Sequence, residues 1–312
     1  MKIAILGASG LVGRTMLSQL EQCCWMSSPP LLLTSERSAG IKLNFRDEEL
    51  VCHAVNENSF NGIEIALFSA GGSVSKKYAP IAVEAGAVVI DNSSAFRMDS
   101  NIPLVVPEIN PTLTTGIIAN PNCSTIQIAM ALQPLHKEFG LLEAHITTLQ
   151  AVSGAGKEAQ QELKNKTVTQ LDVLPKIGDP LPNGSFTEEE KVVNELRKIM
   201  SLPTLGITCL ATRVPVWNGH SASIRAIFST EVDREKAIQA LALFPGVEVA
   251  KSEHEFKTAT EITGKGEVAV GRLRLDPTNN KGLLLWVVAD NLLKGAALNA
   301  VQIAGQIAEA RS

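Results

Sequence analysis

The chain has 312 residues and a formal charge of −4 at pH 7, with similar numbers of acidic and basic residues. Because this length exceeds the roughly 100–200 residues of one typical domain, we expect two domains. The balanced charge excludes a strong overall field for nucleic acid or an anionic membrane, so a bound anion must contact local Arg and Lys side chains. We therefore expect small-molecule ligands, no nucleic acid partner and no membrane partner.

Five cysteines are present, with no CxxC pair and no regular spacing. This pattern is typical of neither a zinc site nor a disulfide framework, so we expect no metal and a reducing compartment. Met1 leads directly into an apolar strand and the turn at Gly7, which leaves no room for a signal peptide. The longest apolar run, near Leu283 to Ala289, is far shorter than the roughly 20 residues of a membrane-spanning helix. We expect a soluble, cytoplasmic protein.

Short apolar runs alternate with helical or turn segments in the first part of the chain, as buried parallel strands do in a doubly wound sheet. The predicted strands are Ile3–Leu6, Leu31–Thr34, Ile65–Ser69, Val88–Ile90 and Ile117–Ala119. The sequence therefore predicts an α/β fold in which residues 1–122 form a Rossmann-type domain with a doubly wound parallel sheet.

Beyond Cys123 the pattern changes to longer strand candidates with fewer helices between them. These candidates are Ala144–Val152, Thr208–Val216, Ser221–Ser229 and Gly282–Ala289. We predict a mixed α+β domain for residues 123–292. Pro and Gly in Leu174–Thr187 predict a loop. Helical spacing of apolar residues in Lys294–Ala310 predicts an amphipathic helix that returns to the first domain, so residues 293–312 are assigned there.

A glycine-rich segment follows the first predicted strand and opens a helix. In this context glycines let backbone N–H groups approach a pyrophosphate at the positive end of the helix. The spacing is GxxGxxG and not GxGxxG, and such turns also occur for packing reasons alone. We predict that the cofactor contacts Gly7, Ser9, Gly10, Leu11, Val12 and Gly13.

The second predicted strand ends at Ser35-Glu36-Arg37-Ser38. An enzyme specific for NAD usually has an acidic residue here that binds the ribose 2′-OH. Arg37, flanked by Ser35 and Ser38, suits the 2′-phosphate of NADP better, although a solvated loop has the same composition. We predict NADP as the cofactor, bound by these three residues.

Cys123 follows an Asn-Pro-Asn turn and precedes a predicted helix that runs toward Phe139. The partial positive charge at a helix N-terminus favours a thiolate, and N–H groups there can stabilise an oxyanion. A thiolate that attacks an aldehyde beside a nicotinamide forms a thiohemiacetal, which becomes a thioester after hydride transfer. We predict that Cys123 is the nucleophile. The other cysteines are interpreted as small buried hydrophobic residues: Cys23, Cys24, Cys52 and Cys209.

Such chemistry also needs a general base. His220 lies in a turn between two predicted strands, a position typical of catalytic groups. His53 and His254 lie among charged residues and are expected to face solvent, while His136 and His145 lie in or beside predicted regular elements. We predict that His220 is the acid/base.

Several segments resemble the aspartate-semialdehyde dehydrogenase family, in the family's order and nearly from end to end. They are Gly7–Gly13, Ser93–Met98, Val106–Asn110, Asn120–Thr125, Gln150 with Ser153–Gly156, Arg213–His220 and Asn291–Asn299. The Asn-Pro-Asn-Cys turn and the Arg-x6-His spacing are more specific than the glycine loop. The resemblance implies NADPH-dependent reductive dephosphorylation of L-aspartyl-4-phosphate to L-aspartate 4-semialdehyde via a cysteine thioester, in lysine, threonine and methionine biosynthesis.

The resemblance also implies roles for residues around the nucleophile. Gln150 would orient the thioester intermediate beside Cys123. Arg213 would bind the substrate α-carboxylate with its planar guanidinium, and Glu188 would bind the α-ammonium.

For the phosphate, the resemblance implies Arg97 and Lys191, with help from Asn122. Glu188 and Lys191 share one helical face by their i, i+3 spacing, which keeps them near one site. The family further implies that residues 123–292 form the catalytic and dimerisation domain of a homodimer, with a subunit-contact segment that here is reduced to Leu171–Gly178. The residues implied to line the nicotinamide are Ser153, Gly154 and Asn291.

Two other interpretations stay open on the sequence alone. N-acetyl-γ-glutamyl-phosphate reductases use the same thioester chemistry, although the Asn-Pro-Asn-Cys turn and Gln150 favour the aspartyl substrate. A catalytically idle relative that binds NADP or a protein partner would be expected to lose at least one catalytic residue. All four are present: Cys123, Gln150, Arg213 and His220.

Overall fold

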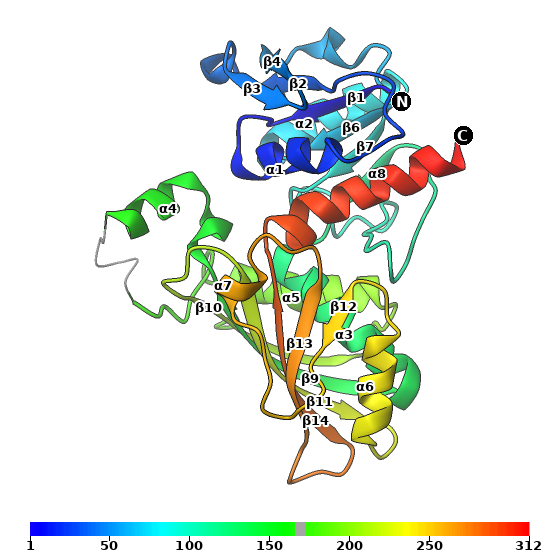
Figure 1. The fold of residues 1–312 in the computed structure, drawn as a ribbon, viewed down its shortest axis with the longest axis vertical. Coiled ribbons are helices and arrows are strands. Elements are labelled where there is room, and N and C mark those ends of the chain that lie inside the picture. The colour runs from blue at the N-terminus through cyan, green and yellow to red at the C-terminus, as the bar shows by residue number, and fades with distance from the viewer. Residues whose placement is uncertain (166–171, 312) are drawn as a thin grey trace. The chain divides into compact units, whose positions relative to one another are not determined.

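A computed structural model describes residues 1–165 and 172–311, in two compact units. The first unit is Met1–Pro121 together with the chain from Ala296 onward, and the second unit is Asn122–Gly295. Figure 1 shows the elements of each unit, coloured in chain order.

The first unit contains a six-stranded sheet in the order β5-β2-β1-β6-β7-β8, with every neighbouring pair parallel. This is the strand order of dinucleotide-binding sheets. The predicted Rossmann-type fold is therefore confirmed. The strands are β1 (Ile3–Leu6), β2 (Leu31–Thr34), β5 (His53–Ala54), β6 (Ile65–Phe68), β7 (Val88–Asp91) and β8 (Ile117–Ala119).

Helices cover this sheet and explain why its strands are continuous apolar runs. They are α1 (Leu11–Leu20), α2 (Gly72–Glu84) and α8 (Leu298–Ala310). The predicted terminal helix is confirmed, and its apolar face packs in one core cluster with Ile3 and Ile5 of β1. Its first turn differs from the prediction, because Leu293–Ala297 forms a π-helical turn before α8 begins.

A hairpin of β3 (Lys42–Phe45) and β4 (Glu48–Val51) was not predicted from the sequence. Its charged residues hide the strand pattern, since only Leu43 and Phe45 are fully buried.

The second unit contains a mixed six-stranded sheet in the order β10-β9-β11-β14-β13-β12, which confirms the predicted mixed α+β class. Its strands are β9 (Leu141–Gln150), β10 (Gly206–Arg213), β11 (His220–Phe228), β12 (Val247–Val249), β13 (Val268–Leu275) and β14 (Gly282–Ala289). Its helices are α3 (Cys123–Phe139), α4 (Lys157–Lys164), α5 (Thr187–Ile199), α6 (Arg234–Ala242) and α7 (Ala259–Ile262). Helix α3 packs on β9 and β11, and α5 packs on β10. The strands β12 and β13 were not predicted.

The strand predicted at Gly282–Ala289 is confirmed as β14, whereas the other three predicted strands of the second unit begin and end earlier than the sequence predicts. This changes the setting of one candidate residue. A short 3-10 helix, Val152–Ala155, follows β9, because the N–H of Val152 bonds out of the strand to the carbonyl of Val216. His220, predicted in a turn, is the first residue of β11 and is completely buried. The predicted loop, Leu174–Thr187, is irregular up to the start of α5, while Leu171 lies outside the described residues.

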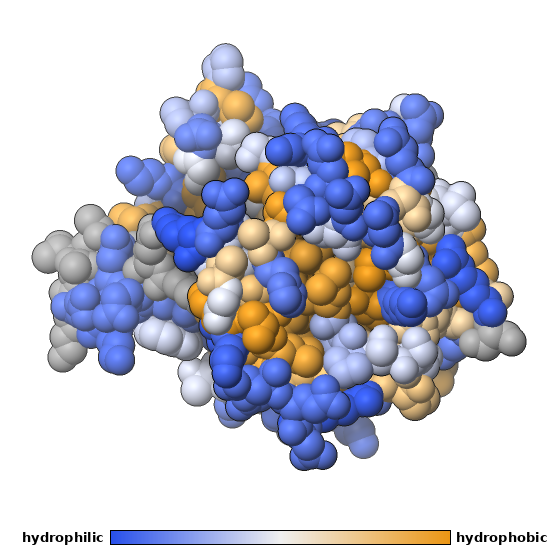
Figure 2. All heavy atoms as spheres, turned by 90° about the horizontal axis from the view of Figure 1, so that it is seen from above, coloured by the Kyte–Doolittle hydropathy of each residue, from blue (hydrophilic) through white to orange (hydrophobic). Residues whose placement is uncertain are grey.

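Figure 2 shows hydrophobic atoms among hydrophilic side chains on the face that it draws, which is ordinary for a folded protein. Among the residues that the structure describes, no helix is both long and apolar enough to cross a membrane. Within the same residues, no group of three or more His, Cys, Asp or Glu side chains is placed to hold a metal ion.

Candidate active site

The predicted nucleophile is the first residue of α3, as the sequence indicated. Asn122 is the N-cap of this 17-residue helix. Its Oδ1 accepts hydrogen bonds from the backbone N–H groups of Ser124 at 2.9 Å and Thr125 at 3.3 Å. This capping fixes where the helix starts and leaves the half-buried Cys123 at the positive end of the helix dipole. Gly295 packs against it, since a Cβ there would lie 3.0 Å from the Cys123 Cβ.

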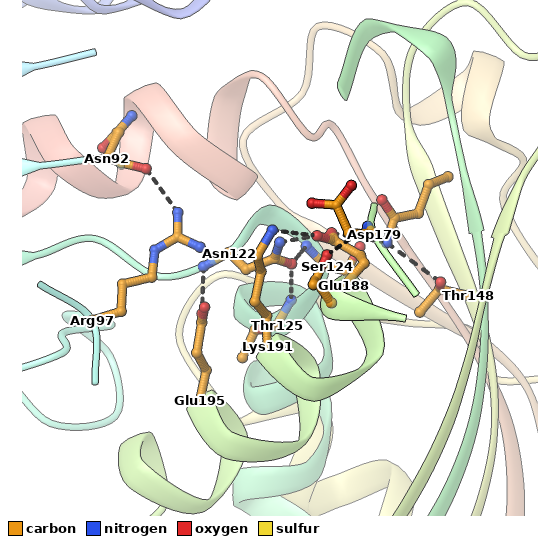
Figure 3. Close-up of polar contacts among 12 residues, drawn as sticks. Asn92, Arg97, Asn122, Ser124, Thr125, Thr148, Asp179, Glu188, Lys191 and Glu195 are labelled. Atoms are coloured by element: carbon orange, nitrogen blue, oxygen red, sulfur yellow. Dashed lines mark hydrogen bonds and ion pairs between the residues drawn. The ribbon is translucent and has the colours of Figure 1, made fainter. Parts of the chain in front are cut away.

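Glu188 of α5 connects three predicted site residues (Figure 3). Its Oε1 accepts hydrogen bonds from Asn122 Nδ2 at 2.7 Å and Gln150 Nε2 at 3.3 Å. Its Oε2 lies 3.1 Å from Lys191 Nζ. Burial raises the pKa of Glu188, but the Lys191 ammonium and the hydrogen bonds outweigh that effect and hold the pKa below its usual value. The carboxylate is therefore charged at neutral pH.

Arg213 is the last residue of β10 and lies in register with Gln150 of β9. Its Nη1 donates to the carbonyl of Ala151 at 2.5 Å, which orients the guanidinium. Burial lowers the pKa of Arg213, and negative charge on Cys123 and Glu188 opposes this effect. The guanidinium and the nucleophile are therefore electrostatic neighbours.

The backbone of the same residue, Ala151, also holds His220. The N–H of Ala151 donates to His220 Nδ1 at 3.0 Å, while its carbonyl binds Arg213. Burial lowers the pKa of His220 to about 3, with a further contribution from the Arg213 cation, so the ring is neutral at neutral pH. A Cβ on Gly154 would lie 3.0 Å from His220 Nε2 and 3.3 Å from Arg213 Nη1, so only glycine fits here without a shift.

The residues implied for the nicotinamide also come together. Ser153 Oγ donates to Asn218 Oδ1 and accepts from Asn291 Nδ2, both at 2.9 Å. Asn291 Oδ1 accepts the N–H of Gly219 at 2.9 Å. This network links the ends of β9, β11 and β14.

The glycine loop of the first unit has the geometry of a phosphate cradle. Gly7 has φ +88°, and a Cβ there would lie 2.8 Å from the carbonyl oxygen of Ser69. A Cβ on Gly13 would lie 2.2 Å from the Gly7 carbonyl oxygen. Gly10 is the N-cap of α1 and no side chain from the described residues caps that helix. A pyrophosphate fits such a site, because backbone N–H groups face it without side chains in the way.

The residues predicted for the 2′-phosphate follow β2. Arg37 is exposed in a short 3-10 helix, Glu36–Ser38, for which Ser35 is the N-cap. Ser9 of the glycine loop lies near the end of this strand, because its Oγ is 2.9 Å from Thr34 Oγ1.

Arg97, implied for phosphate, is a buried residue of the first unit. Its Nε donates to the carbonyl of Asn120 at 2.9 Å, and its Nη2 donates to the carbonyl of Asn92 at 2.7 Å (Figure 3). Lys191, the other implied phosphate residue, belongs to the second unit.

The remaining cysteines differ from the interpretation in one case. Cys52 is buried and Cys23 and Cys209 are half-buried, but Cys24 is exposed, because only one of two adjacent side chains after α1 can face the core. Burial raises the pKa of Cys23 and Cys52. Burial, then Glu189 and Glu188, raise the pKa of Cys209 to about 12.

Two family models cover most of the chain. The model matching residues 2–116 is described as the semialdehyde dehydrogenase NAD binding domain, and the model matching residues 132–294 as the semialdehyde dehydrogenase dimerisation domain. Aspartate-semialdehyde dehydrogenases of Bacillus subtilis and Aquifex aeolicus are each 44% identical, over 97% of this chain and 96% of theirs. The chain belongs to the aspartate-semialdehyde dehydrogenase family. A crystal structure of aspartate semialdehyde dehydrogenase II from Vibrio cholerae, complexed with ASA, is similar with a TM-score of 0.95 and 41% identity, covering 99% of this chain and 98% of that one.

Membership of this family confirms the resemblance carried by the motifs, and the second unit collects most of the residues that they imply. Sequence reasoning missed two features of that unit. One is Ala151, whose role the sequence does not indicate because only its backbone N–H and carbonyl act. The other is Glu195 of α5, whose Oε2 accepts the N–H of Asn122 at 2.6 Å. Its i+7 spacing from Glu188 was the available signal, since it places both carboxylates on one helical face.

Proposed function

We propose that the protein reduces L-aspartyl-4-phosphate to L-aspartate 4-semialdehyde with NADPH, releasing phosphate, through a thioester on Cys123. The observation that supports this most is the placement of Cys123 at the start of α3, electrostatically coupled to the half-buried Arg213. Aspartate-semialdehyde dehydrogenases that are 44% identical to this chain over nearly its whole length support the choice of substrate.

Binding of the amino-acid part is assigned to two charged residues. The guanidinium of Arg213, which is oriented by the Ala151 carbonyl, donates two parallel hydrogen bonds to the α-carboxylate. Glu188, a buried and charged carboxylate, accepts the α-ammonium. Arg97 and Lys191, with Asn122, are assigned to the phosphate, as the resemblance implies.

The reaction begins when the Cys123 thiolate attacks the acyl carbon and phosphate leaves, forming the thioester. N–H groups at the start of α3 stabilise the oxyanion of the tetrahedral state, and Gln150 orients the thioester. Bound NADPH supplies hydride to the thioester carbon. The resulting thiohemiacetal collapses to the aldehyde and returns the thiolate.

His220 is assigned to proton transfer at the thiohemiacetal oxygen. In the unliganded protein its pKa, near 3, is far below the pH at which a base works best. A substrate carboxylate at Arg213 would offset the cation that helps to depress this pKa, so substrate binding would make His220 more basic.

NADP is assigned to the first unit on the fit of its glycine loop: Gly7, Ser9, Gly10, Leu11, Val12 and Gly13. The contacts to the 2′-phosphate are assigned to Ser35, Arg37 and Ser38. The nicotinamide contacts are assigned to Ser153, Gly154 and Asn291.

A cytoplasmic homodimer is also proposed. The matched dimerisation-domain model supports the dimer. So does the alternation along β9, where Ala144, Ile146 and Thr148 are buried while His145 and Thr147 between them stay partly exposed, leaving one sheet face available. No disulfide joins any of the five cysteines, all of which are described, as suits a reducing compartment. Sedimentation equilibrium tests the dimer.

The decisive experiment is oxidation of aspartate semialdehyde with NADP and phosphate, followed by the absorbance of NADPH. Activity that requires both phosphate and NADP supports the proposal. Activity only with N-acetylglutamate semialdehyde would assign the protein to the γ-glutamyl reaction instead, and no activity with either would leave an idle relative.

A further inference from the structure

We infer that Glu195 is a positioning residue for the nucleophile: it binds the backbone N–H of Asn122 and so holds the turn from which Cys123 projects. The inference rests on the proposed role of Cys123. Glu195 acts through the residue that precedes the thiol.

The N–H of Asn122 needs an acceptor from outside its own helix. An N-cap residue takes no part in the helix ladder through its N–H, and Asn122 is 6% exposed, so water cannot replace a lost partner easily. Glu195 supplies that acceptor at 2.6 Å, from a side chain that is 1% exposed.

Helix α5 therefore holds Asn122 from two sides. Glu195 binds its backbone N–H and Glu188, two turns earlier, binds its side-chain Nδ2 at 2.7 Å. The remaining polar atom of the side chain, Oδ1, caps α3. Figure 3 shows both carboxylates reaching toward Asn122 from the same helix.

The helix itself is tied to the sheet that carries Arg213. Glu189 accepts the N–H of Ala211 in β10 at 3.0 Å, two residues before Arg213, and the N–H of Phe186 at 2.8 Å. Helix α5 therefore supports both Asn122, which precedes Cys123, and the strand that carries Arg213. A misplacement of about 1 Å at a reacting group can cost about a hundredfold in rate.

Three substitutions separate reach from charge. Glu195→Gln keeps an oxygen at the same reach and removes the charge, Glu195→Asp keeps the charge and shortens the reach, and Glu195→Leu removes the acceptor. The matched control is Glu190→Leu on the same helix, because Glu190 binds Asn183 and Ser185 and has no contact with Asn122 among the described residues.

We expect Glu195→Gln to keep kcat within about threefold, while the Asp and Leu variants lose about ten- to a hundredfold in kcat with KM changed less than about threefold. Hydrogen exchange at Asn122, Ser124 and Thr125 should accelerate in the Asp and Leu variants only. The Glu190→Leu control should match the wild type in both measurements.

A wild-type kcat in Glu195→Asp combined with a large loss in Glu195→Gln would show that charge and not reach matters, and would overturn the inference. So would wild-type kcat and exchange in a folded Glu195→Leu protein. If the Glu195→Leu protein does not fold, the comparison of kcat between the Glu195→Asp and Glu195→Gln proteins tests the inference. If the wild type lacks phosphate-dependent activity, the proposed function fails and hydrogen exchange alone decides the role of Glu195.

Discussion

Replacing Arg213 by lysine tests both the substrate and the geometry of the second unit. The guanidinium already gives one nitrogen, Nη1, to the Ala151 carbonyl at 2.5 Å. Its other N–H groups are those assigned to the substrate α-carboxylate. A lysine ammonium is a point charge and cannot serve the carbonyl and a bidentate carboxylate in the same geometry.

The magnitude follows from the bonds that are lost. A hydrogen bond to a charged group contributes about 1.5–3 kcal/mol, and Arg213→Lys must weaken either the bond to Ala151 or one of the two bonds to the carboxylate. With some loss of positioning at Cys123, we expect catalytic efficiency with aspartate semialdehyde to fall by about 2–4 kcal/mol, or about 30- to 900-fold.

The assay compares aspartate semialdehyde with 3-aminopropanal, which lacks the α-carboxylate. The second aldehyde should be poor with the wild type and should lose little more in the variant. Arg234→Lys is the control, because Arg234 also donates to a backbone carbonyl, that of Leu273 at 2.9 Å, but lies on α6. Equal losses on both aldehydes would mean that Arg213 supports the fold or the phosphate, and the reasoning about the carboxylate would be refuted.

Three further results are expected. Cys123→Ala should abolish phosphate-dependent turnover by several orders of magnitude while NADPH affinity, measured by fluorescence titration, stays nearly unchanged; substantial residual turnover would contradict the thioester. Arg37→Ala should raise the KM for NADP about ten- to a hundredfold and leave that for NAD nearly unchanged, because only NADP carries the 2′-phosphate; equal effects would return Arg37 to a solvated loop. His220 has a folded pKa near 3 against 6.5 unperturbed, so the unfolded chain binds one more proton between these values. Its contribution to stability is therefore full above pH 6.5 and is lost as the pH falls toward 3, with a slope of up to about 1.4 kcal/mol per pH unit. In urea unfolding at several pH values, His220→Leu should show a shallower slope than the wild type and the exposed His254→Leu should not; identical slopes in all three would contradict the buried neutral ring.

The local rules of helix starts and buried strands were enough to predict the helix that begins at Cys123 and five strands of the first sheet. Cys123 is the first residue of α3 because Asn122 is a strong N-cap, and both facts follow from residues that are adjacent in the sequence. The apolar runs of β1, β6 and β7 are buried throughout, so their pattern needed no tertiary information. The β3–β4 hairpin gives no such signal, because β3 has only two apolar residues and β4 begins with two adjacent glutamates.

By itself, the sequence determined the class of each sheet, the glycine turn, the capped cysteine and, through its motifs, the family. Only the tertiary structure decided which groups meet. His220 and Arg213 lie far from Ala151 in the chain, yet one binds its N–H and the other its carbonyl because β9 pairs with both β10 and β11. Glu195 reaches the N–H of Asn122 across 73 residues for a similar reason, since α5 packs against α3. Capping and hydrophobic periodicity act between neighbours in the chain, whereas hydrogen bonds and charges act between neighbours in space, and folding is what makes these residues neighbours.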